Sequence, residues 1–116
     1  ELYYLREVFM AKLEQTLTGD FNSILRKIEE GIINGSISAS LEDGSDFCMD
    51  DTRCSVRVFE RYSYTGGNRV SLNVTLFGNR DAIHLSAIAS GGSQALFFKL
   101  NTFGEEAFLD KLREIL

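Results

Sequence analysis

Basic and aromatic side chains in the second half of the chain have the types and spacing to hold an anion or a flat ligand. In the strand register derived below, one row across a sheet contains Arg57, Thr75, His84 and Lys99. Cross-strand neighbours lie ~5 Å apart, so such a row would place cationic groups where they could bind a carboxylate or phosphate. Phe59 and Phe97 flank the row and could stack on a ring. The whole expected patch comprises Arg57, Phe59, Arg61, Asn73, Thr75, His84, Phe97 and Lys99.

Three interpretations of this patch stay open. Exposed aromatic side chains in a polar surface favour an interface, most simply a homodimer or a contact with another protein. A solvated face, with arginine stems covering the phenylalanines, is the second interpretation. A site for a small anionic ligand is the third.

Three residues near the end of one expected strand form a second candidate site. Glu60, Tyr62 and Tyr64 continue the phase that we expect to be buried. A carboxylate beside tyrosines, in a cavity between the sheet and a C-terminal helix, could act as a general base. The alternative is that Glu60 pairs with an arginine and the tyrosine hydroxyls reach water.

Metal and nucleophile chemistry find little support in the sequence. The segment 42–51 carries five carboxylates and Cys48, but the spacing does not match a calcium loop, so we expect a solvated loop. His84 is the only histidine, and no spacing suggests a catalytic triad. We therefore expect no catalytic residue, no metal and no cofactor. Whether Cys48 and Cys54 form a disulfide stays open.

The elements that would position these residues form an antiparallel meander. Period-two alternation predicts strands over 52–64, 69–77, 82–90 and 94–100, separated by glycine-containing turns. We expect Val58 to face Val74 across a three-residue loop at 65–67, which places the valines of both strands on the buried face. Two-residue turns at 79–80 and 91–92 then complete the register.

The rest of the chain predicts a strand over 11–18, a helix over 20–33 begun by Asp20, a strand over 36–41, and a last helix from Thr102. The fold class is therefore α+β: a two-layer domain with an antiparallel meander of five to six strands and two helices on one face. We expect a helix-grip-like arrangement, in which the sheet curves around the C-terminal helix, with a ferredoxin-like layout as the alternative.

Composition limits the classes of function. The 116 residues suit one domain, which we expect over 10–116, with 1–9 as an upstream extension. Asp and Glu number 17 against 12 Lys and Arg, a net charge of −5, which argues against a nucleic-acid partner. No apolar run approaches the ~20 residues that span a bilayer, so we expect no membrane partner and a cytoplasmic location.

Four sequence runs resemble an uncharacterised family of small bacterial proteins of unknown function, mainly from clostridia and their relatives. The runs are GIINGSISASL at 31–41, RCSVRVFERY at 53–62, SGGSQ at 90–94 and FGEE at 103–106. The resemblance covers residues 10–116. It implies a bacterial cytosolic protein and assigns no activity or catalytic residue.

Two hypotheses of function follow. The first is a non-catalytic domain that acts through its polar sheet face, as a homodimer or a protein-interaction module. The second is a small-molecule carrier, or less plausibly an enzyme, with its cavity at Glu60, Tyr62 and Tyr64.

Overall fold

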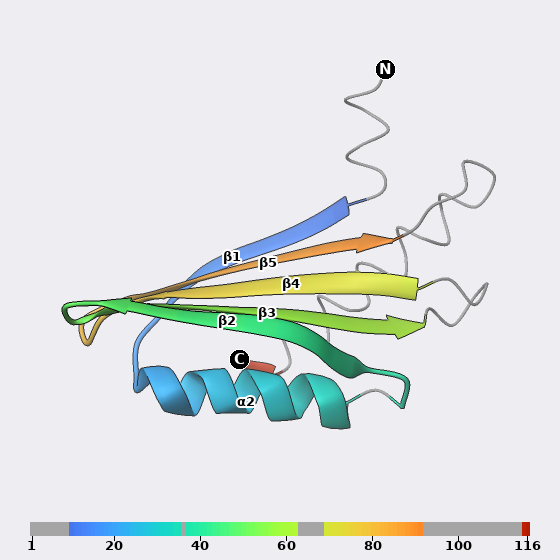
Figure 1. Ribbon diagram of the computed structural model, residues 1–116, viewed down its shortest axis with the longest axis horizontal. Coiled ribbons are helices and arrows are strands. Elements are labelled where there is room, and N and C mark those ends of the chain that lie inside the picture. The colour runs from blue at the N-terminus through green and yellow to red at the C-terminus, as the bar shows by residue number, and fades with distance from the viewer. Residues whose placement is uncertain (1–9, 36, 63–68, 92–114) are drawn as a thin grey trace, which may run out of the picture.

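The computed structural model describes residues 10–35, 37–62, 69–91 and 115–116 as an open antiparallel sheet with a helix on one face (Figure 1). The elements are β1 (Met10–Leu17), α2 (Phe21–Asn34), β2 (Ser40–Met49), β3 (Thr52–Tyr62), β4 (Arg69–Gly78) and β5 (Ile83–Gly91). The five strands lie in the order β1-β5-β4-β3-β2, each antiparallel to its neighbours. The α+β class and the antiparallel meander are confirmed. A ferredoxin-like layout is wrong, because β2 to β5 follow one another as adjacent strands without a helical crossover.

The predicted helix is confirmed as α2, and its start follows from local chemistry. Asp20 is the N-cap, and its Oδ2 accepts hydrogen bonds from the backbone N and the Oγ of Ser23, each at 2.9 Å. These two bonds lower the pKa of Asp20 from its usual value. Gly19 precedes the cap with φ +138°, a conformation that L side chains rarely adopt.

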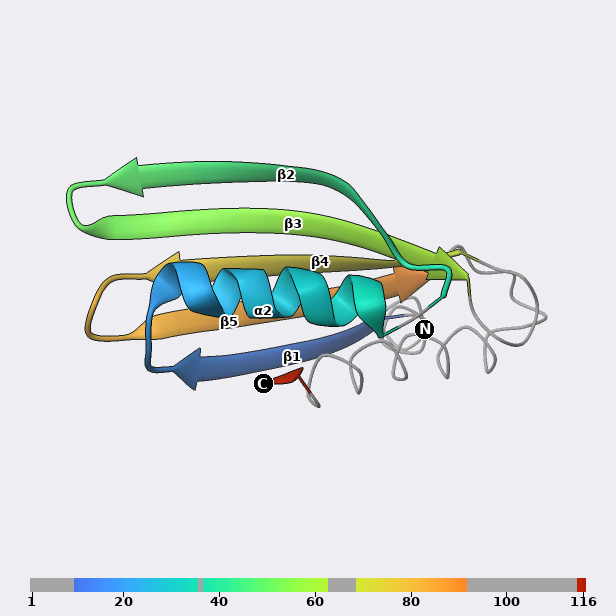
Figure 2. The ribbon, with the colours of Figure 1, turned by 90° about the horizontal axis from the view of Figure 1, so that it is seen from below.

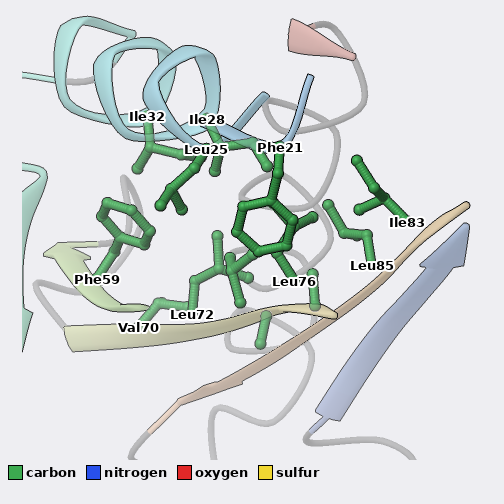
Figure 3. Packing of buried hydrophobic residues seen from close by; sticks show 13 residues of the cluster. Phe21, Leu25, Ile28, Ile32, Phe59, Val70, Leu72, Leu76, Ile83 and Leu85 are labelled. Atoms are coloured by element: carbon green, nitrogen blue, oxygen red, sulfur yellow. The ribbon is translucent and has the colours of Figure 1, made fainter. Parts of the chain in front are cut away.

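The apolar stripe of α2 packs on the sheet as expected. Figure 3 shows Ile28 and Leu25 facing side chains that rise from β3, β4 and β5. The buried cluster comprises Phe21, Leu25, Ile28, Ile32, Phe59, Val70, Leu72, Val74, Leu76, Ile83, Leu85, Ala87 and Ala89. Ile115 and Leu116 pack against the same cluster. The other residues of the predicted C-terminal helix lie outside the described residues.

The register between β3 and β4 differs from the one predicted. Val58 lies opposite Asn73, and Phe59 lies opposite Leu72. The connection 63–68 has an even number of residues, so odd positions of β3 share a face with even positions of β4. The predicted pairing of Val58 with Val74 is therefore wrong, and the helix-facing side of β3 carries Phe59 in place of the valines.

The register between β4 and β5 keeps the predicted phase but is shifted by two residues. The predicted two-residue turn is a four-residue connection, because Gly78 pairs with Ile83. Its backbone is closed by Asn79 N donating to Ala82 O at 3.1 Å, and the Asn79 side chain accepts from Asp81 N at 2.8 Å. The other neighbour of β5 is β1, which takes the place expected for the segment 94–100. That segment lies outside the described residues.

The segment expected to be an acidic loop is a strand. β2 runs from Ser40 to Met49 beside β3, whereas the sequence predicts a strand that ends at Leu41. The hairpin turns at 50–51, where Asp50 has φ +56°, a conformation that aspartate tolerates. Ile37, expected to point inward, is fully exposed. In Figure 2, α2 lies over β4 and β5, with β1 along one side of it and β3 and then β2 on the other.

Candidate functional site

The sheet face opposite α2, called the open face below, carries both polar and apolar side chains. Register alone assigns its residues, because directly opposed residues share a face. One row across four strand pairs runs through Thr16, His84, Phe77, Cys54 and Phe47. The next row runs through Glu14, Ser86, Thr75, Val56 and Ser45. The third contains Lys12, Ile88, Asn73, Val58 and Asp43.

Large apolar side chains on this face are exposed. Phe47 is 65% exposed, Phe77 49% and Ile88 38%, and Met49 beside them is 78% exposed. The side chains of Val56 and Val58 are half-buried among them. Exposed apolar groups gathered on one face mark a binding surface more often than a solvated one.

Two hollows flank Phe77. The His84 hollow has a volume of about 390 Å³ and is lined by Glu14, Thr16, Thr75, Phe77, His84 and Ser86, among others. The Met49 hollow has a volume of about 500 Å³, and its apolar lining includes Phe47, Met49, Cys54 and Phe77. Phe77 is thus the ridge between two depressions on one surface, of which the His84 hollow is the more polar.

The polar groups of the open face are held by one another. Thr16 Oγ1 lies 3.1 Å from His84 Nδ1. Glu60 forms an ion pair with Arg69, and Arg69 also lies 3.7 Å from Glu42. Among the described residues no carboxylate orients the His84 ring, so the pair lacks the third group that activates a hydroxyl nucleophile.

Arg57 lies on the helix side of the sheet, within a polar cluster. Its Nε donates to Glu29 Oε2 on α2 at 2.6 Å, and its Nη2 donates to Asp46 Oδ1 on β2 at 3.0 Å. Ser55 Oγ donates to the same Asp46 oxygen at 2.6 Å. A Cβ at Gly44 would lie 2.9 Å from Arg57 Cδ, so only glycine leaves room for the arginine to cross β2. We call Glu29, Asp46, Ser55 and Arg57 the Arg57 cluster.

Protonation follows from this geometry. Burial works to lower the pKa of Arg57, but the hydrogen bonds to Glu29 and Asp46 outweigh it and raise that pKa. The Ser55 hydroxyl and the Arg57 guanidinium lower the pKa of Asp46. Arg57 and Asp46 therefore stay charged at neutral pH, and the hydrogen bonds of the Arg57 cluster tie α2 to β2 and β3.

The structure divides the predicted patch between two faces. Asn73, Thr75 and His84 lie on the open face, whereas Arg57, Phe59 and Arg61 lie on the face toward α2. Phe59 is fully buried and Arg61 is 4% exposed. Predicting these three together with His84 is wrong, because the hairpin parity is reversed. Phe97 and Lys99 lie outside the described residues.

The predicted cavity residues also occupy a different place. Glu60 lies opposite Ser71 on the open face, and Tyr62 is 53% exposed beside the Arg69 guanidinium, 5.6 Å from the ring centre. They do not line a space between the sheet and a helix; the alternative interpretation, Glu60 paired with an arginine, is confirmed. Tyr64 lies outside the described residues.

Both cysteines are free thiols on opposite faces. Cys54 lies directly across the strands from Phe47 on the open face, and Cys48 lies directly across from Arg53 on the face toward α2. The carboxylates of the expected loop are spread along β2 and its turn. In the described part of the chain, no three His, Cys, Asp or Glu side chains gather as metal ligands do.

Sequence reasoning missed Thr16 and Phe47 as open-face residues. Thr16 was missed because the pairing of β1 with β5 is non-local, and Phe47 because 42–51 lacks an alternating apolar pattern. The sequence contained one signal for the correct face of β3. Phe59 is a large apolar side chain and is most often buried, so its odd position indicates that the odd residues of β3 face the core.

The chain belongs to a protein family. The family described as "Family of unknown function (DUF6054)" matches residues 10–116. A comparison with curated proteins finds no match. Among the described residues, no helix has the length and apolarity needed to cross a bilayer.

Proposed function

We propose that this chain is a non-catalytic protein-interaction module that forms a homodimer through the open face of its sheet. The observation that carries the proposal is the exposure of Phe47 and Phe77, 65% and 49%, on a face that α2 does not cover. The position of Phe77 between the two hollows gives a partner a ridge to pack against and depressions to fill.

The open face has the size of a dimer interface. Its strands have 8 to 11 residues, which at ~3.3 Å per residue and ~4.8 Å between strands gives a face of roughly 700 Å². Stable interfaces bury about 800 Å² per partner. Two such faces packed against each other would form a sandwich of two sheets, with side chains interleaved about 10 Å apart.

Electrostatics permit this contact. The ion pairs of the open face, Lys12 with Glu14 and Arg69 with Glu60, neutralise charge within one molecule. Because two of its three strand carboxylates, Glu14 and Glu60, are paired within one molecule, this face meets its own copy with less like-charge repulsion than a uniformly acidic face would suffer. The rows through Phe77 and Ile88 then supply the apolar contact.

Sedimentation equilibrium tests the proposal. The unmodified chain should be a dimer at micromolar concentration, and Phe77→Asp should shift it to monomer by placing a charge at the centre of the contact. Ile37→Asp is the control, because Ile37 is also an exposed apolar side chain but lies outside the sheet. A monomer at all concentrations would refute the homodimer, and equal effects of both variants would refute the assigned face.

A small-molecule carrier is the second candidate, and the Met49 hollow is the observation that favours it. Its volume of about 500 Å³ falls in the ~300–1,000 Å³ range of ligand pockets. The apolar lining suits a hydrophobic molecule. An anionic ligand loses support, because Arg57 is already bound to Glu29 and Asp46. Retained small molecules in native mass spectra, lost on Met49→Asp, would support the carrier.

Two finer expectations stay predictions. One is the bacterial cytoplasmic setting. The other is the helix-grip-like arrangement with a second helix on the α2 side, which is supported by Ile115 and Leu116 packing against the core there.

A further inference from the structure

The two outermost strands of the described sheet, β1 and β2, differ in how their edges are protected against pairing. β2 has a register shift between Leu41 and Asp43, and its charged residues Glu42, Asp43 and Asp46 are all carboxylates. Such irregularities and charges keep an edge strand from pairing with another chain. The eight residues of β1 instead pair with β5 in an unbroken register and carry one charge of each sign.

The outer edge of β1 is open to a further strand. Among the described residues, β1 pairs with β5 alone. Figure 2 shows β1 as the outermost strand on the side opposite β2, and in Figure 1 residues 115–116 lie in the layer of α2, outside the plane of the sheet. The backbone N–H and C=O groups of β1 that point away from β5 can therefore form a second ladder of hydrogen bonds.

The charges of β1 complement themselves. Lys12 lies opposite Ile88 and Glu14 lies opposite Ser86, so both charged side chains are on the open face, where they are 59% and 67% exposed. When two copies of β1 pair antiparallel about a two-fold axis at Leu13, Lys12 of each copy lies directly opposite Glu14 of the other. The contact of Lys12 with Glu14 inside one copy, at 4.0 Å, is kept, because the four charges alternate in sign around a square.

The position of the two-fold axis is specified by these charges. Moving the axis by one residue sets either Lys12 opposite Lys12 or Glu14 opposite Glu14 of the copy, and directly opposed like charges destabilise a strand pair. The axis at Leu13 also brings the two Leu13 side chains together on the face toward α2, where Leu13 is half-buried and packs against the core. Each copy would cover part of the Leu13 surface that the other leaves in water.

We propose that a second copy of the chain pairs with the outer edge of β1, antiparallel and centred on Leu13, so that the two sheets become continuous. Strand addition at an edge supplies affinity through main-chain hydrogen bonds. A two-fold contact needs a single self-complementary surface, which β1 provides. This contact lies in the plane of the sheet and is separate from the open-face contact. An open-face dimer therefore presents two such edges, through which dimers join into larger assemblies.

The edge contact is smaller than the open-face contact and should form at higher protein concentration. One strand of eight residues from each copy takes part, whereas a standard interface buries about 1,600 Å² in total. We therefore expect edge pairing at sub-millimolar concentration, above the micromolar range of the open-face dimer. The Phe77→Asp chain, which lacks the open-face contact, isolates the edge contact. Association of that chain is measured independently of whether the open-face dimer exists.

Sedimentation equilibrium of two charge variants of the Phe77→Asp chain tests the inference. Lys12→Glu and Glu14→Lys each set like charges opposite one another, so each variant alone should associate about tenfold more weakly than the Phe77→Asp chain. An equimolar mixture of the two should regain most of the lost affinity, because opposite charges then face each other at both positions. The recovery is not a general attraction between proteins of opposite charge: both variants stay net negative, since each changes a net charge of −5 by two.

Lys27→Glu and Glu30→Lys are the matched controls, because they make the same charge changes at exposed positions of α2. They should leave the association unchanged, alone or mixed. Amide hydrogen exchange of the Phe77→Asp chain locates the contact: exchange in β1 should slow as the concentration rises, and exchange in β2 should not.

Four results would overturn the proposal. A mixture that associates no more tightly than the single variants would refute the register at Leu13. Concentration-dependent slowing of exchange along β2 would assign the contact to the other edge. Exchange in β1 that is already slow at the lowest concentration, and stays constant, would show that its edge is covered within one chain. A monomer at millimolar concentration would show that the β1 edge does not accept a second copy.

Discussion

Replacing Arg57 by methionine should destabilise the fold by about 2 kcal/mol, because methionine keeps the aliphatic packing but loses the guanidinium. Hydrogen bonds to charged groups contribute about 1.5–3 kcal/mol each when shielded. Here the partners regain water on loss of the arginine, since the Glu29 side chain is 30% exposed and that of Asp46 is 58% exposed. The two bonds together are therefore worth roughly one fully shielded charged bond.

Urea unfolding followed by circular dichroism measures this loss, with Arg26→Met as control. Arg26 is exposed on α2, and methionine and arginine have similar helix propensities. Glu29→Gln should cost less, and a double-mutant cycle of Arg57→Met with Glu29→Gln should show a coupling of about 1 kcal/mol. A loss below about 0.5 kcal/mol for Arg57→Met is the value expected of a solvated arginine, and it would refute the placement of Arg57 on the helix side.

Three further perturbations test other parts of the fold. Phe59→Ala should lower the free energy of unfolding by about 3–4 kcal/mol, because Phe59 is fully buried. Val58→Ala should lower it by about 1 kcal/mol or less, because Val58 lies on the open face. The reverse ranking of the two variants would contradict the register of β3. Gly31→Ala should lower the melting temperature, although alanine favours helix, because the added Cβ would lie 2.5 Å from Ile115 Cδ1. In an Ile115→Ala background, Gly31→Ala should instead raise the melting temperature. Asp46→Asn should destabilise by less than ~1 kcal/mol at neutral pH, since the carboxylate is largely exposed. The pKa of Asp46 is lowered in the folded chain, so its contribution is fully present above the unfolded value and is lost as pH falls through the folded one. The difference from the parent chain should therefore begin to shrink below about pH 4 and vanish only below the folded pKa.

Local signals predicted the elements that carry regular patterns. Asp20 followed by the stripe Phe21, Leu25, Ile28 and Ile32 gave α2 to within one residue at each end. Alternation and glycine-containing turns gave β3, β4 and β5 with similar accuracy. These elements are specified by short-range chemistry, which a single sequence contains.

The register of β3 failed because three arginines, Arg53, Arg57 and Arg61, occupy its helix-facing side. We assigned the valines of β3 inward and the arginines outward, whereas Arg57 turns inward and is neutralised by Glu29 and Asp46. That compensation joins residues 28 and 11 positions away in the chain. Because the side-chain period of a strand is two, this one error exchanged the faces of all β3 residues.

β2 could not be recognised for a related reason. A half-buried strand alternates polar and apolar residues, but β2 is exposed on both faces and shows no such alternation. Its extended conformation comes from pairing with β3 and from the hydrogen bonds that Asp46 accepts from Ser55 and Arg57. Neither source leaves a periodic pattern in residues 40–49.

The two thiols allow the open-face contact to be measured within one molecule. Both cysteines border the Met49 hollow, but the side chain of Cys54 belongs to the open face and that of the exposed Cys48 to the other face of β2. Initial rates of alkylation by iodoacetamide should therefore be followed for each thiol as the protein concentration rises from low micromolar to sub-millimolar. A homodimer through the open face predicts that Cys54 becomes progressively slower while Cys48 keeps its rate. Rates for Cys54 that do not change with concentration, or that fall in parallel with those of Cys48, would contradict it.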